Sequence, residues 1–252
     1  MRRTNTTEMA LFTLPPPDNA TFEFNPASLS SPIRIVIQPQ GKWRMPLHWH
    51  PHENNNTVLS CKRLVMLSGP LHVFTVKGTS GGCDTLASGP MEMEFELGQR
   101  VAWGREKGIE ERLVVDLVAD HTLWRNICSS VLDKDIFPQL TSTPFWLKAV
   151  FAILSYAPPL RRTLLNMMLW VQLQAIFFSH DFYIYYGRIP FTWLWICQPF
   201  GGDPPDRAKH LTLKSEYLIS RLVMTTAYYA GLMFLGIKER YSEYTQVNGN
   251  PP

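Results

Sequence analysis

The sequence predicts a mainly β protein with an α-helical extension, in which an antiparallel β-barrel or sandwich precedes apolar C-terminal helices. Short β-type runs separated by turns fill residues 32 to 119, and short strands at this spacing are typical of small barrels and sandwiches. After Asp120 the pattern changes to long apolar stretches of helical character. We therefore expect three regions: an irregular arm at 1–31, a β-barrel at 32–120 and a helical extension at 121–252.

The arm is rich in Pro, Asn, Ser and Thr, as in LPPPDNAT, and this composition predicts little regular structure. The clearest strands are expected at 33–41, 57–67, 71–78, 91–98 and 111–120. In MEMEFEL, the apolar residues alternate with glutamates, which predicts a half-buried strand. The Gly-rich segment KGTSGGCD predicts a hairpin loop between two strands.

Three apolar helices are expected in the extension, at 145–157, 161–178 and 214–241. The last contains an apolar run from Leu222 to Ile237 that would span about 24 Å, which is shorter than the ~30 Å hydrocarbon core of a bilayer. We therefore expect this helix to pack on the barrel or on a second subunit, in a homodimer. Contact with a membrane surface is the alternative.

Composition excludes several classes of protein. The chain has 252 residues, of which 45% are hydrophobic and 18% charged, so it can form a substantial core. Its net charge of +3 comes without a Lys/Arg cluster, so we expect no nucleic-acid partner. The widely spaced Cys61, Cys83, Cys128 and Cys197 form no CxxC pair, which favours reduced thiols. We expect an intracellular protein, cytoplasmic or peripherally attached to a membrane.

Three histidines alternate in HWHPHE, at His48, His50 and His52, with Glu53 beside them. In an extended strand their imidazoles would project from one face, toward the barrel interior if the strand lies in it. Glu53 has the opposite parity and would turn away from that face unless the strand bulges.

This segment resembles the first motif of the cupins, which are small jelly-roll β-barrels: Gly41, then HWH on a strand, then a β-run that reaches Gly69. The order of barrel and apolar tail, with FFSHDFYIYYG and a closing YSEYT, resembles small fungal cupins of polyketide-type secondary-metabolite clusters. The resemblance covers about residues 32 to 245.

The resemblance implies a divalent metal (Fe, Mn or Zn), with His48 and His50 as the family's histidine pair and His52 as a third ligand. Two departures weaken this implication. Asparagines at 54 to 56 stand where the family's glutamate belongs, and Trp103 stands at the histidine of the second motif. An indole nitrogen cannot ligate a cation, because its lone pair belongs to the ring. A weakly bound metal and a metal-free pocket both stay open.

The function implied by resemblance is a biosynthetic oxidoreductase that acts on an apolar polyketide- or terpenoid-like intermediate. Trp43, Trp103 and Tyr183 are its expected substrate contacts. A metal-independent isomerase, dehydratase or cyclase with His48, His50 and Glu53 as proton carriers is the first alternative. A non-catalytic protein that binds a hydrophobic intermediate or a partner enzyme is the second.

Two other histidines have weaker predictions. His180 could act as a general base oriented by a carboxylate, but its neighbour Asp181 is badly placed to pair with it, since adjacent side chains diverge. We expect His72 to face solvent or the edge of the core.

Overall fold

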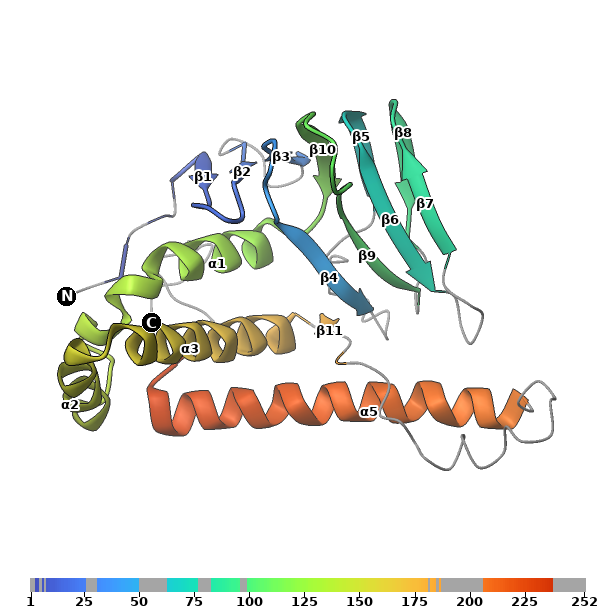
Figure 1. The fold of residues 1–252 in the computed structure, drawn as a ribbon. Coiled ribbons are helices and arrows are strands. Elements are labelled where there is room, and N and C mark those ends of the chain that lie inside the picture. The colour runs from blue at the N-terminus through green and yellow to red at the C-terminus, as the bar shows by residue number, and fades with distance from the viewer. Residues whose placement is uncertain are drawn as a thin grey trace.

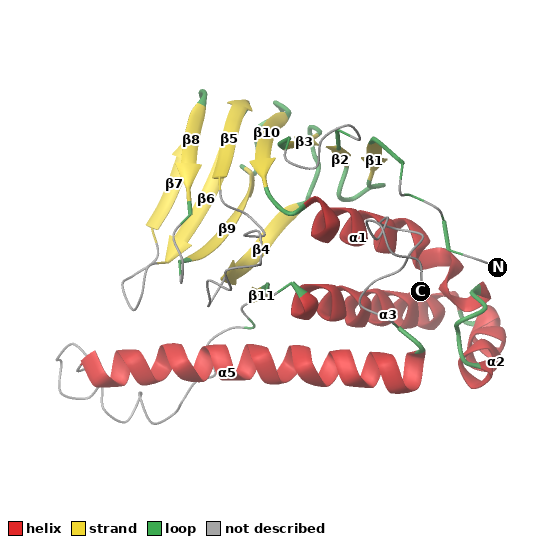
Figure 2. Cartoon of the chain, turned by 180° about the vertical axis from the view of Figure 1, so that it is seen from behind, coloured by secondary structure: helices red, strands yellow, loops and turns green. Residues whose placement is uncertain are grey.

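The fold consists of two antiparallel β-sheets and a layer of helices beneath them (Figures 1 and 2), as the sequence predicts. It is given by a computed structural model that describes residues 3, 4, 6, 8–25, 31–49, 63–76, 83–95, 99–180, 182–184, 186 and 206–237. The side chains of Trp49 and of residues 206–214 lie outside this description.

One sheet has six strands, in the order β1-β2-β3-β10-β5-β8, and the other has five, in the order β11-β4-β9-β6-β7. The strands of the first are β1 (Leu11–Thr13), β2 (Ala20–Glu23), β3 (Ile33–Ile37), β10 (Leu113–Val118), β5 (Arg63–Ser68) and β8 (Met91–Glu94). Those of the second are β11 (Tyr183–Ile184), β4 (Arg44–Trp49), β9 (Arg100–Arg105), β6 (Leu71–Val76) and β7 (Cys83–Ala87).

The core lies between the two sheets and follows from the alternation of side chains along each strand. In β3, Ile33, Ile35 and Ile37 are completely buried, while Arg34 between them is exposed and pairs with Asp116 of β10. Alternating apolar residues of β10, β5, β6 and β9 enter the same cluster. The predicted hairpin is confirmed by the antiparallel pairing of β6 and β7, although Cys83 and Asp84 of the predicted loop belong to β7.

The arm expected to be irregular contains two strands, so this prediction was wrong for residues 11–13 and 20–23. Phe12 and Phe22 are completely buried, and β2 pairs with β3. Apolar residues alternate along these two strands and enter the core, although polar residues and prolines dominate the composition of the arm. Its start is held against the helices, where the Thr6 and Ser129 hydroxyl oxygens lie 2.6 Å apart.

Both glycines of the His-containing motif occupy positions that exclude a side chain. Gly69, in the turn between β5 and β6, has φ +90°, and a Cβ there would lie 2.1 Å from the Arg112 carbonyl oxygen. A Cβ on Gly41 would lie 2.7 Å from the Asp18 carbonyl oxygen. These glycines therefore allow segments of backbone to pass close to each other.

The helical layer begins directly after β10. Its elements are α1 (His121–Leu132), η1 (Asp133–Gln139), α2 (Phe145–Ile153), η2 (Leu154–Tyr156), α3 (Pro158–Ser179), α5 (Asp206–Ala230) and the π-turn η4 (Gly231–Leu235). The predicted helices correspond to α2, α3 and α5. Helix α5 runs beside α3, and α2 lies at the end of the layer farthest from the five-stranded sheet (Figures 1 and 2). The expected packing of the tail on the protein is thus observed for one face of α5.

Candidate functional site

His48 lies near the end of β4, where a bulge changes the direction of its side chain. Met45 pairs with Trp103 of β9, and His48 pairs with Val101, so three residues of β4 correspond to two of β9. Because directly opposed residues share a face, His48 joins the face of Val101 and Met45. Pro46 lies within this bulge, and proline is found in sheets mainly at edges and bulges. The bulge thus directs His48 inward, and its exposed fraction is 2%.

A hydrogen bond and a ring contact help to hold the His48 ring. Its Nδ1 lies 2.8 Å from the Pro46 carbonyl oxygen. A carbonyl only accepts, so Nδ1 carries the hydrogen, and Nε2 carries the lone pair of the neutral ring. The Phe182 ring stacks on the imidazole, with centroids 4.2 Å apart and an interplanar angle of 16°. These contacts fix both the orientation and the tautomer of His48.

The other predicted members of this site, His50, His52 and Glu53, lie outside the described residues, so their placement stays a prediction. Within the described part of the chain, no three His, Cys, Asp or Glu side chains are grouped so that they could hold a metal ion. Trp103 occupies the place of the ligand that the second motif would supply, and an indole donates but does not ligate. Of the three predicted ligands only His48 is among the described residues, so the metal centre implied by the resemblance stays a prediction.

Trp43 and Trp103 lie side by side in the core. Their rings meet edge to face at 5.2 Å, and Trp43 also contacts Phe22 at 5.4 Å and Trp124 at 6.2 Å. The Trp103 side chain is buried, and its Nε1 has no hydrogen-bond partner among the described residues. The interior next to β4 and β9 is thus apolar and aromatic, as predicted, and these residues pack against one another. Their role in substrate binding stays a prediction.

Tyr183, the third predicted substrate contact, lies in β11 and pairs with Trp49 of β4. Its ring is buried and packs edge to face on Tyr217 of α5, with centroids 5.1 Å apart. Tyr183 therefore links the edge of the five-stranded sheet to helix α5. Its neighbours Phe182 and Ile184 lie next to His48, the first by ring stacking and the second by strand pairing.

His180 has a carboxylate partner that the sequence does not indicate. Its Nδ1 lies 2.9 Å from Asp120 Oδ2, while Asp120 Oδ1 accepts a hydrogen bond from the Thr122 backbone N–H at 2.8 Å. Asp120 is therefore both the N-cap of α1 and the residue that orients the imidazole. His180 Nε2 is buried without a hydrogen-bond partner among the described residues. The signal available in the sequence was an Asp at the N-cap position of a new helix.

The pKa of Asp120 reflects these contacts. Burial alone would raise the pKa of this carboxyl, but the hydrogen bond and charge of His180, together with backbone N–H groups at the start of α1, outweigh burial. The pKa of Asp120 is therefore held below its ordinary value, and the carboxylate is ionised at neutral pH. An ionised Asp120 accepts a hydrogen bond from His180 Nδ1–H and so fixes the orientation of the imidazole.

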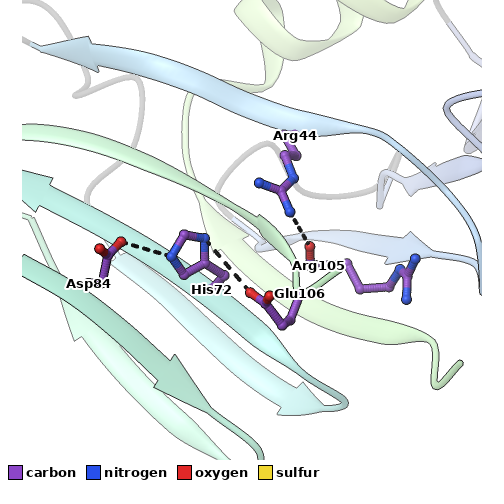
Figure 3. Close-up of polar contacts among 5 residues, drawn as sticks. All are labelled: Arg44, His72, Asp84, Arg105 and Glu106. Atoms are coloured by element: carbon purple, nitrogen blue, oxygen red, sulfur yellow. Dashed lines mark hydrogen bonds and ion pairs between the residues drawn. The ribbon is translucent and has the colours of Figure 1, made fainter. Parts of the chain in front are cut away.

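His72 lies on the outer side of the five-stranded sheet, half-buried at the surface, as expected (Figure 3). Its Nε2 is 2.9 Å from Asp84 Oδ1, and its Nδ1 is 4.0 Å from Glu106 Oε2. The two carboxylates face opposite ring nitrogens, so they do not converge on one point. Beside them, Arg44 donates to the Arg105 carbonyl at 3.1 Å. This group is a network of polar contacts near the surface.

No protein-family model matches the chain, and no curated protein matches it. Among solved structures, the Drosophila melanogaster CENP-C cupin domain is 12% identical over 47% of this chain and 84% of that chain, with a TM-score of 0.32. The capsular polysaccharide assembling protein CapF from Staphylococcus aureus is 11% identical over 44% and 30%, with a TM-score of 0.32. Hydroxypropylphosphonic acid epoxidase from S. wedmorenis is 10% identical over 47% and 58%, with a TM-score of 0.28.

These scores describe a partial and distant likeness, and no residue role follows from them. A cupin domain is among these structures, and the cupins are the superfamily that the HWH segment resembles. The link to secondary metabolism stays a prediction.

Proposed function

We propose that this protein is a cupin-type enzyme that acts by proton transfer at His48 on an apolar, polyketide- or terpenoid-like intermediate of secondary metabolism. The observation that supports the proposal best is the state of the His48 ring. It is buried, stacked on Phe182 and fixed by the Pro46 carbonyl so that Nε2 carries the lone pair. A buried imidazole with a fixed tautomer can accept and return a proton without reorienting.

The residues around this ring support an apolar class of substrate. Phe182 stacks on it, while Ile184 and Val101 are its neighbours on the adjoining strands. A sugar phosphate brought here would lose its hydration without finding polar partners among these side chains. An apolar intermediate would lose little favourable hydration here and would gain apolar contact area. Isomerisation, dehydration or cyclisation of such a molecule needs only a proton acceptor and a donor.

A metal-dependent oxidoreductase is the second candidate, with Fe, Mn or Zn bound by His48, His50 and His52. The bond from Nδ1–H of His48 to a backbone carbonyl favours it, because metal-binding imidazoles usually make such a bond with their second nitrogen. Trp103, which stands where the family's second-motif ligand belongs, favours the metal-free reaction. A non-catalytic protein that binds the same class of molecule is the third candidate.

The test compares wild type with His48→Gln on an apolar metabolite extract of the cells that make the protein, followed by mass spectrometry. We expect wild type to consume a component and form a product of equal mass or one water lighter, and His48→Gln to form none. His72→Gln is the control, because this histidine lies on the outer side of the sheet and should leave turnover unchanged.

Other outcomes identify the other candidates. In one such outcome, the product has lost two hydrogens or gained oxygen, and it forms only when about one equivalent of metal is bound. That result would support the metal-dependent oxidoreductase and contradict proton transfer at His48. A component that co-purifies with wild type unchanged, and is absent from His48→Gln, would indicate a binding protein. Turnover by His48→Gln at the wild-type rate would show that His48 takes no part in the reaction.

We also infer an intracellular location. Cys83 is an exposed free thiol on β7, and exposed free thiols are uncommon in oxidising compartments.

A further inference from the structure

Most of the exposed large apolar side chains of the described residues lie on the helices. It includes the ends of α2 and η2, where Phe145 is 86% exposed and Tyr156 is 92% exposed. Large apolar side chains that contact solvent in this layer are Phe145, Trp146, Ile153, Tyr156, Leu160, Met167, Trp170, Leu218, Leu222, Tyr229, Leu232, Met233 and Phe234. Soluble monomers rarely expose so many together, and such a surface usually marks an interaction site. We refer to this set as the apolar helical face.

Helix α5 shows how the face is built. Glu216, Ser220, Met224, Ala227 and Gly231 are buried and recur every three or four residues, which places them on the side toward the protein. The exposed Leu218, Leu222, Tyr229 and Met233 form a second stripe with the same periodicity. The helix is therefore apolar on two sides, and only one of them is covered.

The end of α5 lies next to the residues that precede α2. A Cβ on Gly236 would lie 2.5 Å from the Ser142 carbonyl oxygen and 3.7 Å from Pro144, the residue before α2. Met233 and Phe234 thus emerge close to the end of α2 that carries Phe145. Figures 1 and 2 show α2 and the end of α5 together at the end of the molecule farthest from β7.

The charge of this region has one sign. From Phe145 to Ser179, which includes all of α2 and α3, the chain has three basic residues, Lys148, Arg161 and Arg162, and no Asp or Glu. Lys148 and Arg161 line a cavity of about 390 Å³ between η1, α2 and α3, together with Phe151 and Pro158. Two cations in an open apolar cavity favour an anionic group with an attached apolar chain.

We propose that the apolar helical face lies in the surface of a membrane that contains anionic lipids, with Lys148 and Arg161 at a headgroup phosphate. The aromatic composition supports this partner, because Trp146, Tyr156 and Tyr229 have rings that favour the boundary between headgroups and acyl chains. Arg221 lies exposed beside Leu222 on α5, where a long basic side chain can reach the headgroups.

A surface contact fits these observations better than a membrane crossing. The segment Ser215–Leu235 is long and apolar enough to cross by length and composition, and only a small part of its most apolar stretch is buried in the protein. However, its buried stripe includes Glu216, which pairs with Arg100 of β9. A crossing would have to break this pair and move a carboxylate into hydrocarbon.

The test is flotation of the full-length protein with vesicles of phosphatidylcholine, alone or with about 30 mol% phosphatidylserine. We expect binding to the anionic vesicles, weakened by high salt, and little binding to the neutral ones. Phe145→Glu/Tyr156→Glu should abolish flotation, because it places carboxylates where the acyl chains would be. Lys148→Gln/Arg161→Gln should weaken binding to anionic vesicles about thirtyfold, from ~1 kcal/mol for each basic residue.

Leu86→Glu is the matched control, because Leu86 is 67% exposed on β7, away from the helices. It should float like wild type. Absence of flotation, or equal flotation of all variants, would overturn the proposal. So would a dimer in sedimentation velocity that Phe145→Glu/Tyr156→Glu dissociates while no variant binds vesicles, because the face would then be a contact with a second copy. Protein that resists extraction by alkaline carbonate would instead indicate a crossing by α5.

Discussion

Arg100 of β9 and Glu216 of α5 form a buried ion pair, with Arg100 Nη1 2.7 Å from Glu216 Oε2. The two residues are separated by 116 positions in the chain and connect the five-stranded sheet to the last helix. Both side chains are largely removed from solvent, with exposed fractions of 10% and 6%. The β and helical regions are therefore joined by a charge-assisted hydrogen bond as well as by apolar contacts.

Replacing one partner of this pair should strongly destabilise the protein. Arg100→Ala leaves the Glu216 carboxylate buried without its cation, which we expect to lower the free energy of unfolding by about 3–5 kcal/mol. Urea denaturation followed by circular dichroism measures it. Arg63→Ala is the control, because the Arg63–Glu92 pair at 2.9 Å is half-exposed and should contribute about 0–1 kcal/mol. Equal losses in both variants would contradict the role assigned to burial.

Gly69→Ala should be among the most damaging small substitutions in the β region. The residue has φ +90°, and the added Cβ would meet the Arg112 carbonyl at 2.1 Å, so the turn between β5 and β6 must shift. We expect a loss of about 2 kcal/mol or more, seen as a lower midpoint in thermal unfolding. Gly89→Ala is the comparison, because a Cβ there meets nothing within 4 Å, and its effect should stay within about 1 kcal/mol.

The Asp120–His180 pair should make stability depend on pH in the acid range. The pKa of Asp120 in the folded protein lies below its ordinary value of about 4. Its contribution is therefore complete above about pH 4 and is lost as the pH falls through the lower, folded-state pKa. Asp120→Asn, which keeps a capping side chain, should be less stable than wild type by about 1.5–3 kcal/mol at pH 7.

Urea midpoints of both proteins, measured in steps from neutral pH to about pH 2, test this expectation. The difference between wild type and Asp120→Asn should shrink through the acid range. His180→Gln should reduce the same acid dependence, since it removes the charge and hydrogen bond of His180 and leaves only the backbone N–H groups of α1 to oppose the effect of burial on the pKa of Asp120. A difference that stays constant with pH would show that Asp120 contributes only as a cap.

Phe182→Ala should affect both stability and the state of His48. The Phe182 ring is completely buried between His48 and Phe177, and removing it leaves a cavity that we expect to cost about 3–5 kcal/mol. The ring-current shift of the His48 protons in NMR spectra should disappear at the same time. Leu86→Ala, at an exposed position, should change stability by no more than about 0.5 kcal/mol.

The fold class was predictable because alternation and apolar length are local signals. The Ile33–Ile35–Ile37 pattern and the apolar stretch of α3 each determine one element without reference to the rest of the chain. The strands β1 and β2 were missed because their apolar residues stand among prolines and polar residues, and they are stabilised by pairing with β3. Such pairing is a tertiary effect that local propensity does not contain.

The candidate site was less predictable, for a similar reason. The inward direction of His48 agrees with simple alternation, yet it is produced by a bulge at Pro46 that the alternation of the three histidines does not reveal. The partner of His180 was unpredictable in detail, because Asp120 approaches it only through the packing of α1 on α3. The sequence shows which residue types are capable of chemistry. Which of these side chains contact one another depends on tertiary packing between segments that are distant in the chain.

The place of β10 in the six-stranded sheet has a consequence for synthesis of the chain. This strand lies between β3 and β5. Ile33 of β3 therefore cannot form its pairing with Leu117 until β10 has been synthesised. Closing so long a loop costs chain entropy before the pairing returns any stabilisation, which slows folding. While β10 is still within the ribosome, β3 and β5 expose apolar edges to other nascent chains. Productive folding during translation should therefore depend on chaperones that cover these strands until residue 118 has emerged.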